Sequence, residues 1–258
     1  MALNDQKAVE EQYRSAEKLK TRISIHEKYS TNRQGFGNWI VSHYQIRSGM
    51  RVLELGCGTG AMWQGKEELI AKCSKLILSD LSEGMLREAE SRLAGIGNIE
   101  YRIIDIQSIP CEDQSFDAVI ANMMLYHVPD LERGLSEVRR VLKKDGAFYC
   151  ATYGEHGIMA YLCGLFGPYG VTDPTSRSFT LQNGEKQLSR FFANVRRLDY
   201  EDALAVTNPE DLADYMLSLA GMSELRKLPR ETLIAVLREN ARDGVLHVPK
   251  EYGMFICG

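Results

Sequence analysis

The chain has 258 residues, 44% of them hydrophobic and 26% charged, with a formal net charge of −4. These values are ordinary for a soluble globular protein, and the acidic balance argues against nucleic acid as a partner, because phosphate binding favours a basic face. No apolar run approaches the roughly 18 residues of a membrane span, and the polar N-terminus does not read as a signal peptide. Six cysteines without a C-x-x-C pair predict reduced thiols and a cytoplasmic protein.

The N-terminal part is expected to be helical, and a regular alternation of strands and helices follows it. Helices are predicted over residues 5–27 and 36–44, before a break at Ser48 and Gly49. Strand-like runs cover 51–55, 75–79, 99–105, 116–122 and 147–152, and helical patterns cover 61–73, 82–93 and 130–142. Short strands alternating with helices predict βαβ units and a parallel sheet, whose ligands bind beyond the carboxyl ends of the strands.

The pattern is less regular after Thr152. We expect a short helix over 158–165, a sixth strand over 195–201 and a terminal strand over 252–257. Asn208 followed by Pro209 predicts the start of a helix that ends near residue 220, and a further helix is expected over 229–240. Aromatic and methionine side chains between 153 and 192 indicate either core packing or an apolar cover over a ligand site.

The most informative segment is VLELGCGTG, residues 52–60, where an apolar strand runs into three glycines. Glycines at alternate positions let the backbone turn sharply and approach a ligand closely. The G-x-G-x-G spacing differs from the G-x-G-x-x-G of pyrophosphate loops, and Glu54 would disfavour a pyrophosphate nearby. A helix starting at Ala61 would direct its first N–H groups back at the ligand.

Further polar residues follow the next strands of the predicted sheet. Asp80 lies 20 residues after Gly60, the separation at which a carboxylate holds a ribose diol. Asp105 follows the third strand and Asn122 the fourth. Because the carboxyl ends of parallel strands meet at one edge, we expect these side chains to surround one cofactor that carries ribose and amino groups.

These motifs together resemble those of the class I S-adenosylmethionine-dependent methyltransferases. The likeness rests on VLELGCGTG, LSD at 78–80, DIQSIP at 105–110, FDAVIANMMLYHVPD at 116–130 and RVLKKDGAFYCAT at 140–152. It is nearest to the small-molecule (methyltransferase type 11) branch that includes ubiquinone- and menaquinone-type enzymes. It covers about residues 50–152 and fades beyond them.

The resemblance implies an α/β fold: a Rossmann-like, doubly wound, seven-stranded, mainly parallel sheet with an antiparallel last strand. N-terminal helices and a helical substrate-cap insertion would complete it. The implied domains are an N-terminal helical cap (1–49), an S-adenosylmethionine-binding core (50–152), and substrate-cap insertions with the last strands (153–258).

The resemblance also implies S-adenosyl-L-methionine as cofactor and a role for each matching residue. The glycine loop would hold the methionine portion, Glu54 would orient that loop, Asp80 would hold the ribose, and the Asn122 carbonyl would receive the amino group. The expected cofactor-binding residues are Tyr29 (as a lid contact), Glu54, Gly56, Cys57, Gly58, Gly60, Asp80, Leu81, Asp105, Ile106, Asn122 and Met123.

The expected reaction is an in-line displacement at the sulfonium methyl group by an O or N atom of a small molecule. His127 is the candidate general base, since histidine titrates near neutrality, and a structural role in the loop at Pro129 and Asp130 is the alternative. Tyr126 would line the pocket or donate a hydrogen bond. Glu155 and His156 would contact substrate or lie in an exposed loop.

Other functions fit the residues less well. A nicotinamide-dependent dehydrogenase is disfavoured by the glycine spacing and by Glu54. Aminopropyl transfer is disfavoured because the acidic residues with which such enzymes bind their substrate are not evident in this sequence. A non-catalytic S-adenosylmethionine-binding protein would carry the same binding residues and stays open. The five histidines lie far apart, so no metal is expected. We expect a monomer or homodimer with a small-molecule substrate.

Overall fold

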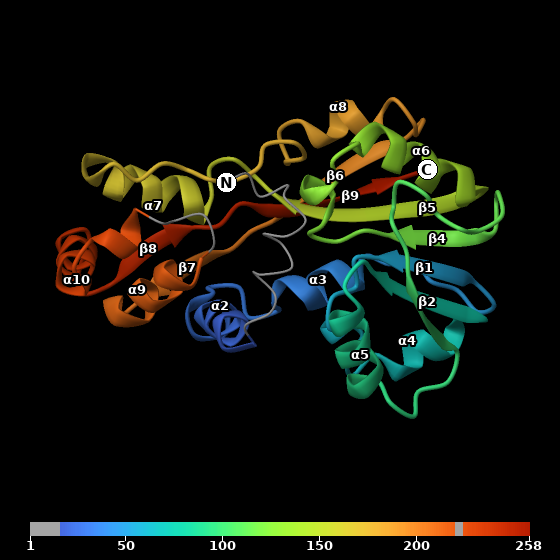
Figure 1. The fold of residues 1–258 in the computed structure, drawn as a ribbon, viewed down its shortest axis with the longest axis horizontal. Helices are drawn as coiled ribbons and strands as arrows, with labels where there is room; N and C mark the ends of the chain where they lie inside the picture. The colour runs from blue at the N-terminus through green and yellow to red at the C-terminus, as the bar shows by residue number, and fades with distance from the viewer. Residues whose placement is uncertain (1–15, 220–223) are drawn as a thin grey trace. The chain divides into compact units, whose positions relative to one another are not determined.

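The computed structural model describes residues 16–219 and 224–258 (Figure 1). The chain divides into two compact units. The first, here the sheet unit, consists of residues 36–153, 178–199 and 253–258. The second, here the helical unit, consists of the residues up to Gly35 with 154–177 and 200–252. The three-part division expected from the sequence stays a proposal.

The sheet unit contains a seven-stranded sheet, as predicted. Its strand order is β3 (Ile99–Ile103), β2 (Lys75–Asp80), β1 (Arg51–Leu55), β4 (Phe116–Ile120), β5 (Leu142–Tyr153), β9 (Tyr252–Cys257) and β6 (Val195–Tyr200). The five strands from β3 to β5 are parallel. Asn194 and Gly258 exchange backbone hydrogen bonds of 2.9 and 3.0 Å, which is the antiparallel pattern, so the sheet is mostly parallel with one antiparallel strand.

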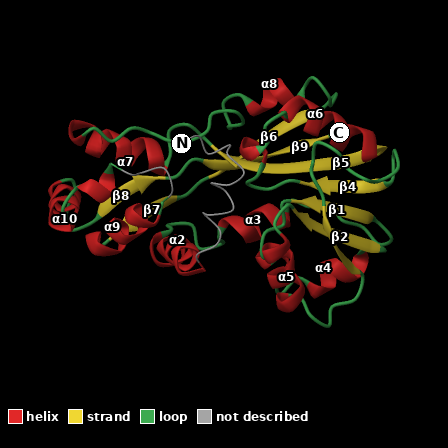
Figure 2. Cartoon of the chain, in the orientation of Figure 1, coloured by secondary structure: helices red, strands yellow, loops and turns green. Residues whose placement is uncertain are grey.

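Apolar side chains of these strands alternate between two cores, one on each face of the sheet. Val52 belongs to the cluster that contains Leu86, and the next residue, Leu53, belongs to the cluster that contains Val138. Helices α4 (Glu67–Lys72) and α5 (Glu83–Arg92) cover one face, and α6 (Leu131–Val141) and α8 (Gly184–Leu188) lie on the other (Figures 1 and 2). A sheet covered on both faces explains why the strands read as apolar runs.

Side-chain caps fix where the two longer helices begin. The Ser82 hydroxyl accepts a hydrogen bond from the Met85 N–H at the start of α5, and Asp130 accepts from the Arg133 N–H at the start of α6. The helix expected over 61–73 is wrong. The 3₁₀ turn η1 (Ala61–Trp63) is separated from α4 by Gly65, whose φ of +70° belongs to the left-handed region that ends a helix. The shorter α3 (Phe36–Ser42) precedes β1 as predicted.

Arg140 of α6 holds the irregular segment that follows β3. Its guanidinium donates to the Ile109 and Cys111 carbonyls at 2.8 Å, while Glu137 accepts from the Ile109 N–H and pairs with Arg140. Several charge-assisted bonds thus position a loop that has no helix of its own.

The helical unit contains α2 (Ala16–Tyr29), α7 (Ile158–Phe166), α9 (Pro209–Ser218) and α10 (Arg230–Glu239). Residues 5–15 of the predicted first helix lie outside the described residues. Asn208 caps α9 as predicted, since its side chain accepts from the Glu210 N–H. The antiparallel pair β7 (Ala203–Val206) and β8 (Leu246–Pro249) was not expected, and Ser30 extends it through a bridge to Leu204.

A buried ion pair joins the segments of the helical unit. Lys250 contacts the Asp202 carboxylate, and their side chains are 3% and 0% exposed. The Lys250 ammonium also donates to the Ser30 hydroxyl at 2.8 Å, and Asp202 accepts from the Asn32 N–H at 3.0 Å. The pair therefore holds the segment after α2 against the start of β7. Because both charged groups are buried away from water, each depends on the other as its partner.

Replacing Lys250 by Met should strongly destabilise the helical unit, because it leaves the Asp202 carboxylate buried without its cation. We expect the free energy of unfolding to fall by about 3–5 kcal/mol, measured by urea titration. Lys227→Met, which breaks an exposed pair with Glu224, is the control and should cost less than about 1 kcal/mol. Adding Asp202→Asn to Lys250→Met should restore part of the loss. A Lys250→Met protein as stable as the Lys227→Met control would contradict this account.

Candidate functional site

The glycine loop, residues 56–60, follows β1 at the carboxyl edge of the sheet. Gly56, Gly58 and Gly60 have φ angles of +70°, +55° and +68°, which side chains with a Cβ rarely adopt. A Cβ on Gly56 would lie 2.9 Å from Met124 Cγ, and one on Gly60 would lie 3.1 Å from Ala89 Cβ. A Cβ on Gly58 would meet nothing within 4 Å. The outer glycines are thus required by packing, whereas Gly58 borders open space.

Asp80, at the end of β2, holds this loop. One oxygen of its carboxylate, Oδ2, accepts the Gly58 N–H at 2.9 Å, and Oδ1 accepts the Ser82 N–H at 2.9 Å. The Cys57 N–H donates to the Ser79 carbonyl at 2.8 Å, which continues the pairing of the two strands into the loop. Each carboxylate oxygen can accept a second hydrogen bond, so Asp80 retains acceptors for hydroxyl groups of a ligand.

Two large apolar side chains are exposed beside Asp80. Leu81 follows it directly and is 51% exposed. Ile103 pairs with Asp80 in the β2–β3 register and is 59% exposed. An apolar pair next to a carboxylate suits a flat ring attached to a diol. Leu81 was expected here from the sequence, whereas Ile103 was not, because nothing local distinguishes it from the half-buried residues of its strand.

Glu54 lies inside β1 and is only 3% exposed. Its Oε2 accepts a hydrogen bond of 2.5 Å from the indole N–H of Trp63. Burial raises the pKa of this carboxyl from 4.5 to about 7, with Asp80 adding to the rise, while the Trp63 and Asn122 donors oppose it. Trp63 was not expected at the site, because the sequence placed it in a continuous helix.

Asn122 follows β4 and is 8% exposed. Its amide Nδ2 donates to the Tyr44 hydroxyl at 2.6 Å, but its Oδ1 has no hydrogen-bond partner among the described residues. A buried acceptor left without a donor costs about 1–3 kcal/mol. Tyr44, buried after α3, is a second residue that the sequence did not indicate, since it is 78 positions from Asn122.

The residues after Asn122 approach the glycine loop from the neighbouring strand. Met123 has a φ of +54°, unusual for a residue with a side chain, and its N–H donates to the Ala151 carbonyl at 2.8 Å. Met124 packs against Gly56. A non-glycine residue in the left-handed region costs of order 1–3 kcal/mol, and such positions gather at functional sites.

Tyr126 and His127 lie in the short turn η2 (Leu125–His127) of the same segment. The Tyr126 ring is buried, with its centroid 4.5 Å from those of His127 and Tyr153. His127 is half-buried, and its N–H donates to the Met124 carbonyl at 2.9 Å. The structure thus places both expected catalytic residues in η2. Met124, which directly precedes this turn, packs against Gly56 of the glycine loop.

Asp105 and Ile106 begin the loop held by Arg140. The Asp105 carboxylate accepts the Gln107 N–H at 2.8 Å and also contacts the Gln107 amide, so it closes the turn. Ile106 is 4% exposed and packs against Gly134 of α6. Its side chain therefore belongs to the core, and its backbone is the part left for a ligand.

Tyr29 belongs to the helical unit, at the end of α2. Its hydroxyl donates to Asp211 Oδ2 at 2.6 Å, and Lys28 pairs with the same oxygen at 3.0 Å. The desolvated hydroxyl and the Asp211 carboxylate raise the pKa of Tyr29. Its contact with the cofactor stays a prediction.

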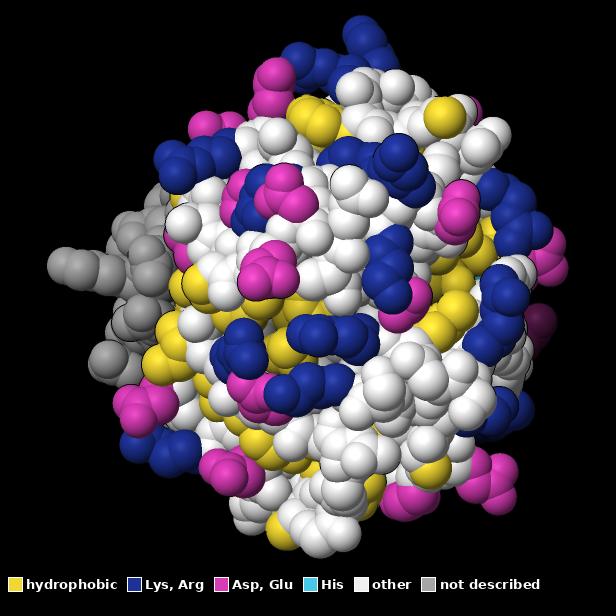
Figure 3. Space-filling view, turned by 90° about the vertical axis from the view of Figure 1, so that its right-hand side faces the viewer, with side chains coloured by type: hydrophobic (Ala, Val, Ile, Leu, Met, Phe, Trp, Pro, Cys, Tyr) yellow, Lys and Arg dark blue, Asp and Glu magenta, His cyan; other side chains and the backbone are white. Residues whose placement is uncertain are grey.

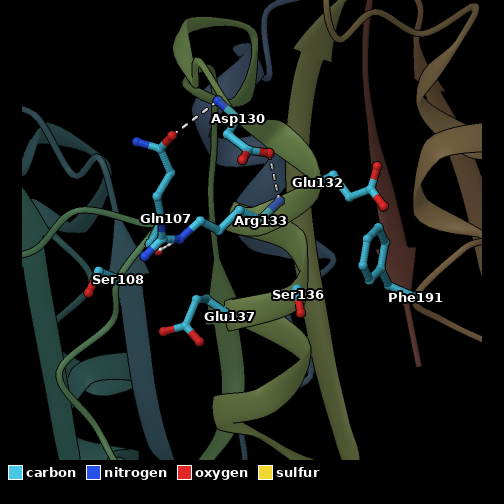
Figure 4. A pocket seen from close by; sticks show the side chains of 8 residues that line it. All are labelled: Gln107, Ser108, Asp130, Glu132, Arg133, Ser136, Glu137 and Phe191. Atoms are coloured by element: carbon cyan, nitrogen blue, oxygen red, sulfur yellow. Dashed lines mark hydrogen bonds between the residues drawn. The ribbon is translucent and has the colours of Figure 1, made fainter.

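A separate cavity of about 570 Å³ lies between the Asp105 loop and α6 (Figure 4). Its charged groups are already paired: Asp130 caps α6, Glu132 pairs with Arg190, and Arg133 donates to the Gln107 carbonyl. The lining residues are Gln107, Ser108, Asp130, Glu132, Arg133, Ser136, Glu137 and Phe191. Asn122 near the glycine loop, by contrast, has a buried acceptor without a partner among the described residues, and we place the candidate site there.

Replacing Glu54 by Gln should stabilise the ligand-free protein at neutral and alkaline pH. Between pH 4.5 and 7 the folded protein keeps a proton on Glu54 that the unfolded chain has lost, so Glu54 lowers stability as pH rises through this window. The variant escapes that cost and should be about 3 kcal/mol more stable above pH 7, with no difference near pH 4. Chemical unfolding at several pH values measures the difference, with the exposed Glu83→Gln as control. Equal pH dependence of the variant and the parent would refute the burial argument.

Comparisons with known proteins identify the segment that carries this site. Residues 53–150 match the family model described as a methyltransferase domain. A stretch of 99 residues is 38% identical to a demethylmenaquinone methyltransferase from Clavibacter sepedonicus, covering 38% of this chain and 39% of that protein. The chain therefore matches about two fifths of the length of this curated relative.

Two solved structures share the fold over most of the chain. The YcgJ protein from Bacillus subtilis has a TM-score of 0.62 at 18% identity, with 85% of this chain and 96% of that chain covered. The [4+2]-cyclase SpnF has a TM-score of 0.59 at 17% identity, with 99% and 96% covered. At these identities the likeness establishes the fold, which different chemistries share.

Proposed function

We propose, from the match of residues 53–150 to a methyltransferase domain, that the protein transfers a methyl group from S-adenosyl-L-methionine to a small-molecule acceptor. The observation that carries the proposal is the carboxyl edge of the neighbouring strands β2, β1 and β4, where Asp80, Glu54 and Asn122 lie and where the Asp80 carboxylate holds Gly58 beside open space. Parallel sheets bind ligands at this edge.

The residues present fit this cofactor in their chemistry. The Gly58 side of the loop is open, Asp80 has acceptors left for ribose hydroxyls, and the exposed Leu81 and Ile103 offer an apolar surface for adenine. Glu54 and the Asn122 Oδ1 are buried acceptors that an amino group would satisfy. Gly56, Gly60, Cys57, Met123, Asp105 and the Ile106 backbone complete the proposed contacts.

The chain's own contribution to the reaction is chiefly alignment. When bound, the cofactor supplies a methyl group that its sulfonium already activates. The protein must then hold the acceptor in line and exclude water, which can supply about 7–11 kcal/mol. Tyr126 forms part of the wall, and His127 takes the proton of an O or N acceptor.

A non-catalytic S-adenosylmethionine-binding protein is the alternative, because the same contacts would hold the cofactor without turnover. The two readings differ at the turn η2, since only an enzyme needs His127 as a base. Binding of the cofactor without methylation of any acceptor in a broad panel of phenols and amines would favour the alternative.

We further propose that the protein acts in the cytoplasm as a monomer or homodimer, without a nucleic-acid partner. Helices long and apolar enough to span a bilayer are absent from residues 16–219 and 224–258. On the face drawn in Figure 3, basic and acidic side chains are interspersed and form no single-sign surface. Nucleic-acid binding favours a continuous basic surface.

Replacing Gly58 by Ala should strongly weaken cofactor binding at a small cost in stability. The new methyl group would project into the proposed ligand space, while the positive φ costs about 1 kcal/mol. We expect the Kd for S-adenosylhomocysteine in calorimetry to rise at least about 100-fold, or nearly 3 kcal/mol. Gly95→Ala is the matched control, since Gly95 also has a positive φ of +82° and open space but precedes β3 at the opposite edge. Equal affinities for the two variants would overturn the proposed site.

His127→Ala should lower kcat by about 10²–10⁴-fold and leave cofactor affinity nearly unchanged, because a general base acts only in the chemical step. The exposed His247→Ala, on β8, is the control and should retain full turnover. The measurement is steady-state methylation of the best acceptor alongside calorimetry of S-adenosylhomocysteine binding. Unchanged turnover in the His127 variant would assign this histidine a structural role.

A further inference from the structure

Glu54 is a buried acidic group without a cation. Among the described residues, no Lys, Arg or His nitrogen forms an ion pair with it, and its only close donors are the Trp63 indole and the Asn122 amide. An ionised carboxylate in such a place is costly unless it is paired. The carboxyl of the ligand-free protein is therefore suited to hold a proton.

The groups that face Glu54 from neighbouring elements add to this preference. Asp80 from β2 is a like charge, and the ionised forms of Tyr44 and Cys57 would be further like charges. Burial and Glu54 itself keep the pKa of both Tyr44 and Cys57 above their usual ranges, so these two stay neutral. Of these groups, Glu54 is the one whose pKa lies near neutrality.

A second observation points to a positively charged ligand at the same place. The Asn122 side chain lies next to Glu54 and turns its Nδ2 to the Tyr44 hydroxyl, which leaves the buried Oδ1 without a donor. Two acceptors thus adjoin each other, one able to become negative and one neutral. An ammonium group has three N–H donors and one positive charge, so it can satisfy both.

We propose that the amino end of the cofactor displaces the Glu54 proton when it binds. The proposal rests on the function proposed above, which supplies the ligand. In the binding step the O–H bond of the Glu54 carboxyl breaks, its proton goes to the solvent, and the carboxylate pairs with the ammonium that the ligand already carries. The Asn122 Oδ1 accepts a second N–H of the same ammonium.

This exchange makes cofactor affinity depend on pH. Below about pH 7 each bound ligand releases close to one proton, so affinity should rise as much as tenfold per pH unit up to that point. Above it, Glu54 is already ionised and no proton is released. The α-amino group of the ligand stays protonated through this range, because its ordinary pKa is about 7.7–8.0.

The exchange is measured by calorimetry of S-adenosylhomocysteine binding at pH 6 in two buffers with different enthalpies of ionisation. We expect release of close to one proton from the parent protein and none from Glu54→Gln. A matched ligand, 5′-methylthioadenosine, shares the adenosine but lacks the amino group, and it should bind without release. Binding of S-adenosylhomocysteine by the parent protein with no proton released would overturn this inference and leave the proposed function standing. Failure to bind at all would overturn the proposed function itself.

Trp63 provides a readout in the absence of ligand. Since its indole donates to Glu54, its fluorescence in a Trp39→Phe background should titrate near pH 7, and the Glu54→Gln variant should abolish that transition. Trp63→Phe removes a donor that favours the ionised form. It should therefore move the midpoint of ligand-linked proton release to higher pH while keeping the release itself. A fluorescence profile that is flat from pH 5 to 8.5, or a midpoint unmoved in Trp63→Phe, would contradict the role of Glu54.

Discussion

The carboxylate of Asp80 is the interaction on which the site depends. It accepts one N–H from the glycine loop after β1 and another from the start of α5 after β2, so one side chain joins two turns of the sheet edge. Three glycines at positive φ would otherwise give this loop wide conformational freedom. Because the loop is fixed before a ligand arrives, binding does not have to supply the entropy of ordering it.

Much of this fold could be predicted because its signals are local. Strands covered on both faces are apolar runs, and Ser82 and Asn208 mark helix starts by their own side chains. The prediction failed at Gly65, where apolar spacing continued past a residue with left-handed backbone. It also missed β7 and β8, since short strands from distant parts of the chain show no pattern until they pair.

The site was predictable only in part, for the same reason. Glu54 and Asp80 stand out because an acidic residue in or after an apolar strand is unusual, and the glycines stand out by spacing. Tyr44 and Trp63 do not, because they matter only through contacts made across the fold. The sequence also does not distinguish Ile106, which packs in the core, from Ile103, which is exposed. Both are isoleucines near the end of β3.

The burial of Glu54 lowers the stability of the ligand-free protein at neutral pH. This loss is consistent with a role of Glu54 in binding a positively charged ligand. In the ligand-free protein the carboxyl is either protonated or ionised without a cation, and burial penalises the ionised form. A ligand that supplies the cation removes this cost and adds its own binding free energy to the stability of the folded chain. Strained or desolvated groups of this kind commonly lower the stability of the folded protein at sites where function requires them. Under the proposed function, a cation of the ligand would pair with Glu54 and Asn122, and a well-packed neutral residue in place of Glu54 would give a more stable unit that binds the ligand less well.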